Sequence, residues 1–351
     1  MYFIFKNKYY YLNNSSQLTN LEEKIFNASY HNFDSIALEL FHFQYEHNAL
    51  YKRFTDQLDI LPYQVTEVTS IPFLPISFFK SHAVTTTVFE PQKVFESSGT
   101  TSTINSKHYL KNIQLYNNSF SKTFELFYGP EKDWCIVALL PSYMERQHSS
   151  LIYMVEELIS KSKNKLSGFY LHADEKLYHT LLQNEIIQQP TLFIGVTYAL
   201  LDFAEKFEMN LKYTTVIETG GMKGRREEIT RPELHSILKQ KLGVEEIHAE
   251  YGMTELLSQA YSKGEGLYKC APWMNVYVRD EDDPLLVKEL PQKEKEHTSG
   301  IVNIIDLANI YSCAFIATDD LGRIFGNRSF EVLGRSDISD IRGCSLLVSH
   351  D

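Results

Sequence analysis

Hydroxyl side chains surround a single glycine in residues 97–103, which read SSGTTST. Small residues let the backbone approach an anion closely, Gly99 allows a tight turn, and N–H and O–H groups can donate to phosphate oxygens. The pattern predicts a cradle for a polyphosphate, although an ordinary surface loop rich in Ser and Thr would look the same. The segment has no Walker-type lysine, which disfavours a P-loop nucleotide hydrolase.

A second cluster combines an aromatic residue, a glycine, a hydroxyl and a carboxylate within residues 251–255, YGMTE. Tyr251 offers a face for a base to stack on, Thr254 a donor to phosphate and Glu255 a ligand for Mg²⁺, and Gly252 adds flexibility. We expect these side chains at the end of a strand. The alternative is the start of a helix with Thr254 as its cap.

The composition disfavours several other kinds of chemistry. The four cysteines are too widely spaced for a disulfide framework or a zinc finger, and the 12 histidines form no metal-binding pattern. Without a G-x-S-x-G motif an acyl hydrolase is disfavoured, and His148 is expected to be structural or to lie near an acyl pocket. The net charge of −11, without a basic stripe, argues against a nucleic-acid partner.

The apolar and charged fractions, 43% and 23%, are those of an ordinary globular protein. The N-terminal residues lack the apolar core of a secretory signal, and no stretch of about 18 apolar residues could span a membrane. We therefore expect a cytoplasmic protein with free thiols.

The elements that must position these clusters follow from periodicity. Residues 20–60 are predicted to be helical, because a Ser- and Thr-containing cap precedes acidic and then apolar residues. Pro72 and Pro75 predict an extended, rigid segment over residues 69–82. The β-branched residues 84–91 predict a strand leading to the polar loop.

An α/β organisation follows from the middle of the chain. Apolar, β-rich runs at 134–141, 191–201 and 213–221 alternate with helical patterns such as 149–162 and 227–243. Strands alternating with helices indicate parallel βαβ units. Beyond about residue 265 the pattern changes to strands and turns without long helices, which indicates a smaller β-rich region.

Two later segments complete a recognisable set of motifs: ATDDLGR at 317–323 and GRSD at 334–337. With the two clusters above, these four motifs in this order resemble those of the adenylate-forming (acyl-CoA synthetase and luciferase) superfamily. Segments such as PFLPISFFKS, ETGGMKGRR and KCAPWMNVYVRD narrow the resemblance to the acyl-protein synthetases typified by LuxE, over about residues 70–348. The nearest alternative is a coenzyme A ligase of the phenylacetate type.

The resemblance implies an α/β fold: an adenylate-forming large N-terminal domain with αβ sheets, and a small C-terminal β subdomain. Residues 1–265 would form a helical N-terminal region plus the α/β nucleotide- and acyl-binding domain. Residues 266–351 would form the β-rich subdomain that ends at the hinge. The superfamily's full mobile C-terminal domain, with its adenylation lysine, has no counterpart in the 351 residues.

The same resemblance assigns nucleotide-binding roles. The positions implied to surround the phosphates, the adenine and the ribose of ATP are Ser97, Ser98, Gly99, Thr100, Thr101, Ser102, Gly220, Gly221, Tyr251, Gly252, Asp320 and Arg335. Tyr251 would pack on adenine, Thr254 would donate to the α-phosphate and Glu255 would hold Mg²⁺. Asp320 would bind the ribose hydroxyls, with Arg335 at the hinge reaching the ribose or a phosphate.

Three features of the expected catalysis stay open in the sequence. Asp319 stands where the superfamily's T-G-D has glycine, so either Asp319 or Asp320 could bind the ribose. Lys223, or alternatively Lys80, would replace the missing lysine, or a partner would complete the site. Cys344 would carry the acyl group, with the alternative that it is a small core residue.

The expected function is therefore ATP- and Mg²⁺-dependent activation of a carboxylic acid, with a fatty or aryl acid as substrate, to an acyl-adenylate. Transfer to a protein thiol would follow, with an acyl reductase or an acyl carrier as partner. Coenzyme A ligation and a non-catalytic partner subunit are the alternatives.

Overall fold

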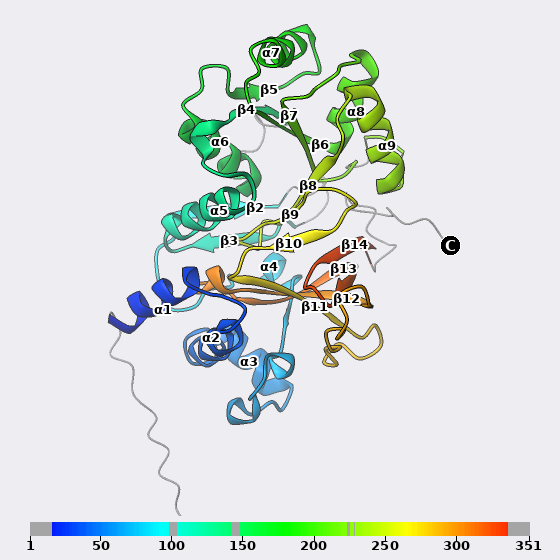
Figure 1. The fold of residues 1–351 in the computed structure, drawn as a ribbon. Coiled ribbons are helices and arrows are strands. Elements are labelled where there is room, and N and C mark those ends of the chain that lie inside the picture. Colours follow the sequence, from blue (N-terminus) through cyan, green and yellow to red (C-terminus); the bar gives the residue numbers. More distant parts are fainter. Residues whose placement is uncertain (1–15, 98–103, 142–147, 223–224, 228, 336–351) are drawn as a thin grey trace, which may run out of the picture.

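The computed structural model describes residues 16–97, 104–141, 148–222, 225–227 and 229–335. These residues build one mixed sheet of twelve strands, a separate two-stranded hairpin, and helices packed around them (Figure 1). The strand order along the large sheet is β11-β12-β13-β14-β10-β9-β8-β7-β6-β4-β5, with β1 paired to β13. The predicted α/β fold is confirmed.

The parallel part of the sheet contains the predicted βαβ units. Its strands are β4 (Cys135–Leu139), β5 (Gly168–Tyr170), β6 (Thr191–Val196), β7 (Thr214–Thr219) and β8 (Ile247–Tyr251). Its helices are α6 (Ser150–Ser162), α7 (Glu175–Ile186), α8 (Thr197–Lys206) and α9 (Arg231–Leu242). Every residue of β4 and β6 is buried, as expected where helices cover both faces of parallel strands.

The antiparallel part continues the same sheet. Its strands are β9 (Ala260–Ser262), β10 (Tyr268–Cys270), β11 (Met274–Arg279), β12 (His297–Asp306), β13 (Phe315–Phe325) and β14 (Phe330–Arg335), with the 3₁₀ turn η5 (Leu307–Asn309) before β13. The predicted strands of this region are confirmed. The domain boundary at residue 265 stays a prediction.

The predicted helical region near the N-terminus is confirmed as α1 (Ser16–Phe26), α2 (Phe33–His47) and α3 (Ala49–Gln57), followed by η1 (Pro62–Gln64) and η2 (Val68–Ser70). The buried side chain of Gln44 attaches α2 to the sheet. Its Nε2 donates to the Asn309 carbonyl at 2.9 Å, and its Oε1 accepts from the Ala314 amide at 2.9 Å. These helices therefore lie against the antiparallel strands (Figure 1).

Two local predictions are wrong. The proline-containing segment is extended only as far as β1 (Leu74–Pro75), because beyond the second proline nothing prevents the short helix α4 (Phe78–Ser81). Residues 84–91 form no strand. The Thr86 amide donates to the Tyr311 carbonyl at 2.8 Å and Thr87 has a φ of 71°, so this backbone follows a loop instead of a ladder.

The hairpin that flanks the polar loop consists of β2 (Lys93–Glu96) and β3 (Lys107–Leu110), and α5 (Ile113–Tyr128) and η3 (Glu131–Asp133) connect it to the parallel strands. Among the described residues, no helix is both long and apolar enough to cross a membrane.

Candidate active site

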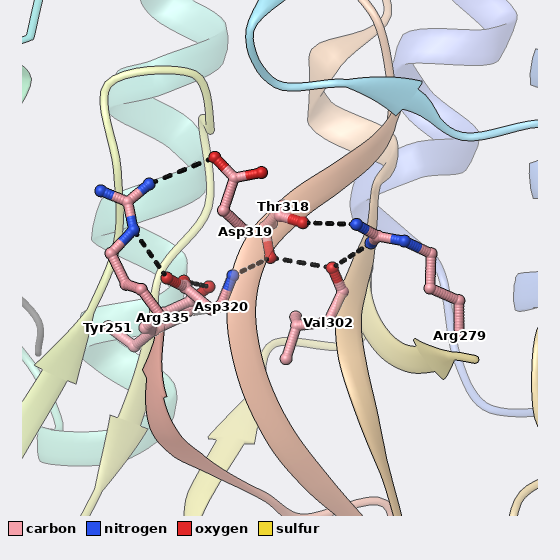
Figure 2. Close-up of polar contacts among 7 residues, drawn as sticks. All are labelled: Tyr251, Arg279, Val302, Thr318, Asp319, Asp320 and Arg335. Carbon is pink, nitrogen blue, oxygen red and sulfur yellow. Dashed lines mark hydrogen bonds and ion pairs between the residues drawn. The ribbon is translucent and has the colours of Figure 1, made fainter. Parts of the chain in front are cut away.

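The side chains of three residues, one each from β8, β13 and β14, meet at the end of β8 (Figure 2). The Tyr251 hydroxyl donates to Asp320 Oδ2 at 2.7 Å. Arg335 lies directly across the ladder from Asp320, with its Nε 3.8 Å from Asp320 Oδ1 and its Nη2 3.4 Å from Asp319 Oδ2. The fold thus brings Tyr251, Asp320 and Arg335, one residue from each of three motifs, into contact.

The two neighbouring aspartates differ in environment. The Asp320 side chain is 11% exposed and faces Tyr251, whereas the Asp319 side chain is 46% exposed. Burial raises the pKa of Asp320, and the Tyr251 hydrogen bond and the Arg335 charge oppose that rise. Asp320 is therefore a buried carboxylate kept close to charged and hydroxyl partners.

Residues 252–259, which follow the tyrosine, form a loop, so the alternative of a helix capped by Thr254 is wrong. The buried carboxylate of Asp306 accepts from the amides of Leu257 at 2.8 Å and Ser258 at 3.0 Å, and from the Ser258 hydroxyl at 2.6 Å. Asn309 Nδ2 donates to the Glu255 carbonyl at 2.8 Å. Side chains from the end of β12 and from η5 therefore satisfy backbone groups of this loop.

The β2–β3 hairpin reaches this loop from the other side. His108 Nδ1 lies 2.9 Å from the Thr254 carbonyl, and burial lowers the pKa of His108 to about 4 against the opposing effect of that contact. The ring is therefore neutral near pH 7, with Nδ1–H donating to the carbonyl. At the hairpin end, the Ser97 amide donates to the Ser106 carbonyl at 3.0 Å, and the Ser106 amide donates to the Ser97 hydroxyl oxygen at 2.9 Å. The Ser106 hydroxyl interacts with Glu255.

Glu255 is a buried carboxylate at 5% exposure. Burial raises its pKa, and the Ser106 hydrogen bond, the Lys80 charge and the Arg335 charge oppose that rise. Lys80, the alternative replacement for the superfamily's lysine, thus acts electrostatically on the same carboxylate as Arg335 does.

The glycines at the ends of β7 and β8 have steric reasons for their identity. Gly220 and Gly221 have φ values of 74° and 64°, in the left-handed region that glycine adopts most readily. A Cβ on Gly252 would lie 2.4 Å from Glu250 Oε1. The same Glu250 carboxylate accepts from the Thr219 hydroxyl at 2.6 Å through Oε2, so the two strand ends are joined beside Tyr251.

The sequence reasoning missed the residues that hold the motifs in place. Asp306, His108 and Asn309 position the loop after Tyr251, and Arg279 contacts the backbone beside Asp320. For Arg279, Asp306 and Asn309 the available signal was a charged or amide residue within a predicted apolar strand or shortly after its end. His108 lies outside the predicted strands and gave no such signal. Such a signal indicates that a polar side chain is buried, but it does not identify the hydrogen-bond partner of that side chain.

Several candidate site residues lie outside the described residues: Ser98, Gly99, Thr100, Thr101, Ser102, Lys223 and Cys344. The roles assigned to them, and to the described site residues, stay predictions.

The chain belongs to the LuxE family, described as acyl-protein synthetase, whose model matches residues 21–351. No curated protein sequence matched the chain.

Solved structures with a similar fold are enzymes of low sequence identity. O-succinylbenzoate coenzyme A synthetase from Bacillus subtilis, in complex with AMP, is 18% identical over 69% of this chain and 49% of its own, with a TM-score of 0.46. The amide bond synthetase of Marinactinospora thermotolerans is 15% identical over 70% and 49%, with a TM-score of 0.47. The luciferase-like enzyme of the mealworm Zophobas morio is 14% identical over 73% and 60%, with a TM-score of 0.46. The chain matches about half the length of the first two, and with these scores the likenesses carry no argument about activity.

Proposed function

We propose that this protein activates a carboxylic acid, with a fatty acid as the favoured substrate, by forming an acyl-adenylate from ATP, and then transfers the acyl group to a protein thiol. The observation that carries the proposal is the contact of Tyr251, Asp320 and Arg335 beside the loop that presents Thr254 and Glu255. Membership of the acyl-protein synthetase family supports the same reaction.

Asp320 would bind the ribose. An ionised carboxylate has about four lone-pair sites, and the Tyr251 hydroxyl uses one on Oδ2. Arg335 Nε, at 3.8 Å from Oδ1, is beyond hydrogen-bond distance and acts by charge. Both oxygens therefore retain acceptor sites for the two hydroxyls of a ribose diol, and Asp320 fits this role better than the exposed Asp319.

Glu255 would hold Mg²⁺. Among the described residues no group of three or more His, Cys, Asp or Glu side chains could hold a metal ion by itself. Mg²⁺ in nucleotide sites is commonly bound by one or two carboxylates together with phosphates and water, so a single buried carboxylate fits. The ion would offset the negative charge of the phosphates.

The acid's carboxylate oxygen would form a bond to the α-phosphorus while the bond from that phosphorus to the bridging oxygen breaks, releasing pyrophosphate. Thr254 and the hydroxyls of residues 97–103 would donate to the phosphate oxygens, which stabilises the transition state. No proton transfer is needed in this step. In the second step the Cys344 thiolate would attack the acyl carbon and AMP would leave.

Acid-dependent exchange between ATP and pyrophosphate tests the first step across a panel of fatty and aryl acids. Asp320→Asn should lower the exchange strongly, whereas the matched variant Asp319→Asn should retain most of it. Absence of exchange with every acid, in folded protein, would favour a non-catalytic subunit.

Labelling with a radioactive acid, ATP and Mg²⁺ tests the second step. Hydroxylamine-labile label should appear on the wild-type protein and be absent from Cys344→Ser, with exchange unchanged. Formation of free acyl-coenzyme A that survives Cys344→Ser would instead favour a coenzyme A ligase.

A further inference from the structure

The segment that carries the aspartates is a bulge in the sheet. In the ladder between β12 and β13, Ile301 pairs with Leu321 and Asn303 pairs with Ala317. Val302 alone fills this interval on β12, whereas three residues fill it on β13. A bulge breaks the regular hydrogen bonds of a ladder and redirects the side chains of the bulged strand. The bulge on β13 consists of the Thr-Asp-Asp segment of the motif.

Arg279 on β11 supplies donors to the backbone groups of this bulge (Figure 2). Its Nη2 donates to the Thr318 carbonyl at 2.8 Å, and its Nη1 donates to the Val302 carbonyl at 3.2 Å and to Asn303 Oδ1 at 2.6 Å. The Thr318 hydroxyl also donates to the Val302 carbonyl, at 2.8 Å, and accepts from the Asp320 amide at 3.1 Å. Thr318 thus connects the Arg279 guanidinium to the Asp320 backbone, because it accepts hydrogen bonds from both.

Burying the charged Arg279 side chain costs free energy, which favourable interactions must offset. Arg279 is 9% exposed, and burial lowers its pKa while the Asp319 charge opposes that change. The acceptors of its three hydrogen bonds are all uncharged. Burying a charge is unfavourable unless its donors are satisfied. In a regular ladder an apolar side chain could take the place of Arg279, and no charge would have to be buried. The guanidinium fork suits the site because the bulge leaves acceptors on two adjacent strands.

We propose that Arg279 is a positioning residue of the nucleotide site: it holds the bulge of β13 in the form that directs the Asp320 carboxylate to Tyr251 and to the ribose. The inference rests on the proposed function, because it specifies how the ribose-binding carboxylate is oriented. Arg279 itself touches neither the Tyr251 hydroxyl nor the Asp320 carboxylate among the contacts of the described residues.

The test compares the dissociation constants of ATP, 2′-deoxy-ATP and 3′-deoxy-ATP by titration calorimetry. The wild-type protein should prefer ATP on the order of ten- to a hundredfold, the effect of one hydrogen bond to a charged acceptor. Arg279→Met should lose most of this preference, as should Asp320→Asn. The double variant should lose no more than Asp320→Asn alone, because both changes remove the same interaction.

A matched control separates orientation from general stability. Gln44 is also buried and also satisfies backbone groups next to β13, but at its start, beside Ala314. Gln44→Met should lower the melting temperature and leave the ribose preference at the wild-type value. Arg279→Lys retains the charge but not the planar guanidinium, so it should lose part of the preference for ATP over the deoxy analogues. If Arg279→Met does not fold, Arg279→Lys serves as the test variant.

Each outcome is decisive. A wild-type ribose preference in Arg279→Met or Arg279→Lys would overturn the positioning role and leave the proposed function intact. Failure of both variants to fold, with Gln44→Met folded, would make Arg279 a core residue and also overturn it. A folded wild-type protein that binds no adenine nucleotide would overturn the proposed function and this inference together.

Discussion

Removing one hydroxyl from the candidate site should have a measurable, pH-dependent effect on stability. Tyr251→Phe keeps the ring and deletes the group that donates to Asp320 Oδ2 at 2.7 Å, in a contact between residues that are 9% and 8% exposed. A hydrogen bond to a charged partner contributes about 1.5–3 kcal/mol. The free energy of unfolding should therefore fall by about that amount at pH values above the folded pKa of Asp320, where this carboxyl group is ionised.

The pH dependence follows from the pKa of Asp320. Burial raises this pKa in the folded protein and the Tyr251 hydrogen bond opposes the rise, so the variant should have a still higher value. A carboxyl group with a raised folded pKa binds more protons in the folded than in the unfolded state, and stability falls as pH increases through that window. The loss caused by Tyr251→Phe should thus be smaller below the folded pKa of Asp320, where the hydroxyl faces an uncharged carboxyl group, and reach its full size above the variant's folded pKa.

Urea unfolding followed by circular dichroism at several pH values between 4 and 8 measures both effects. Tyr170→Phe is the matched control, since the Tyr170 hydroxyl donates at 2.9 Å to the uncharged Thr180 hydroxyl. Tyr170→Phe should lower the free energy of unfolding by a smaller amount, about 1 kcal/mol, and this decrease should not vary with pH in this range. A loss in Tyr251→Phe that is below about 0.5 kcal/mol at pH 8, or larger at pH 4 than at pH 8, would refute the reasoning.

Three further variants address the groups around the site. Burial raises the pKa of Asp306 to about 6, so the folded protein retains a proton that the unfolded chain releases from about pH 4 upward, and this group should lower stability by up to about 3 kcal/mol as pH rises from 4 to 6. Asp306→Asn should flatten that part of the urea-derived stability profile, and an unchanged slope would contradict the assignment. Gly252→Ala would place a Cβ 2.4 Å from Glu250 Oε1 and should destabilise the protein by about 1–3 kcal/mol in urea unfolding; a neutral result would show that Glu250 can move at no cost. Thr230→Ala removes the side chain that caps α9 and should cost about 1 kcal/mol in thermal unfolding while leaving nucleotide affinity unchanged, so that weaker ATP binding would point to a role beyond capping.

Much of the fold was predictable because its signals are local. The apolar runs at 134–141 and 213–221 are strands β4 and β7, and the periodic stretch at 149–162 is a helix. Local patterns were misleading where partners came from elsewhere. The β-branched residues 84–91 are a loop because their backbone bonds to the Tyr311 region, and Thr254 caps no helix because Asp306 satisfies the amides that follow it.

The candidate site shows the same division. The residue types available for chemistry and their order could be taken directly from the sequence. Local patterns also predicted that Tyr251 and Gly220 lie at strand ends. The tertiary structure alone gives the hydrogen bond between Tyr251 and Asp320, which are 69 positions apart, and the hydrogen bond from Arg279 to the Thr318 carbonyl in the bulge that contains Asp320. Periodicity is a property of neighbours along the chain, whereas the partner of a buried polar group depends on strand order and register, which the packing of the whole sheet sets.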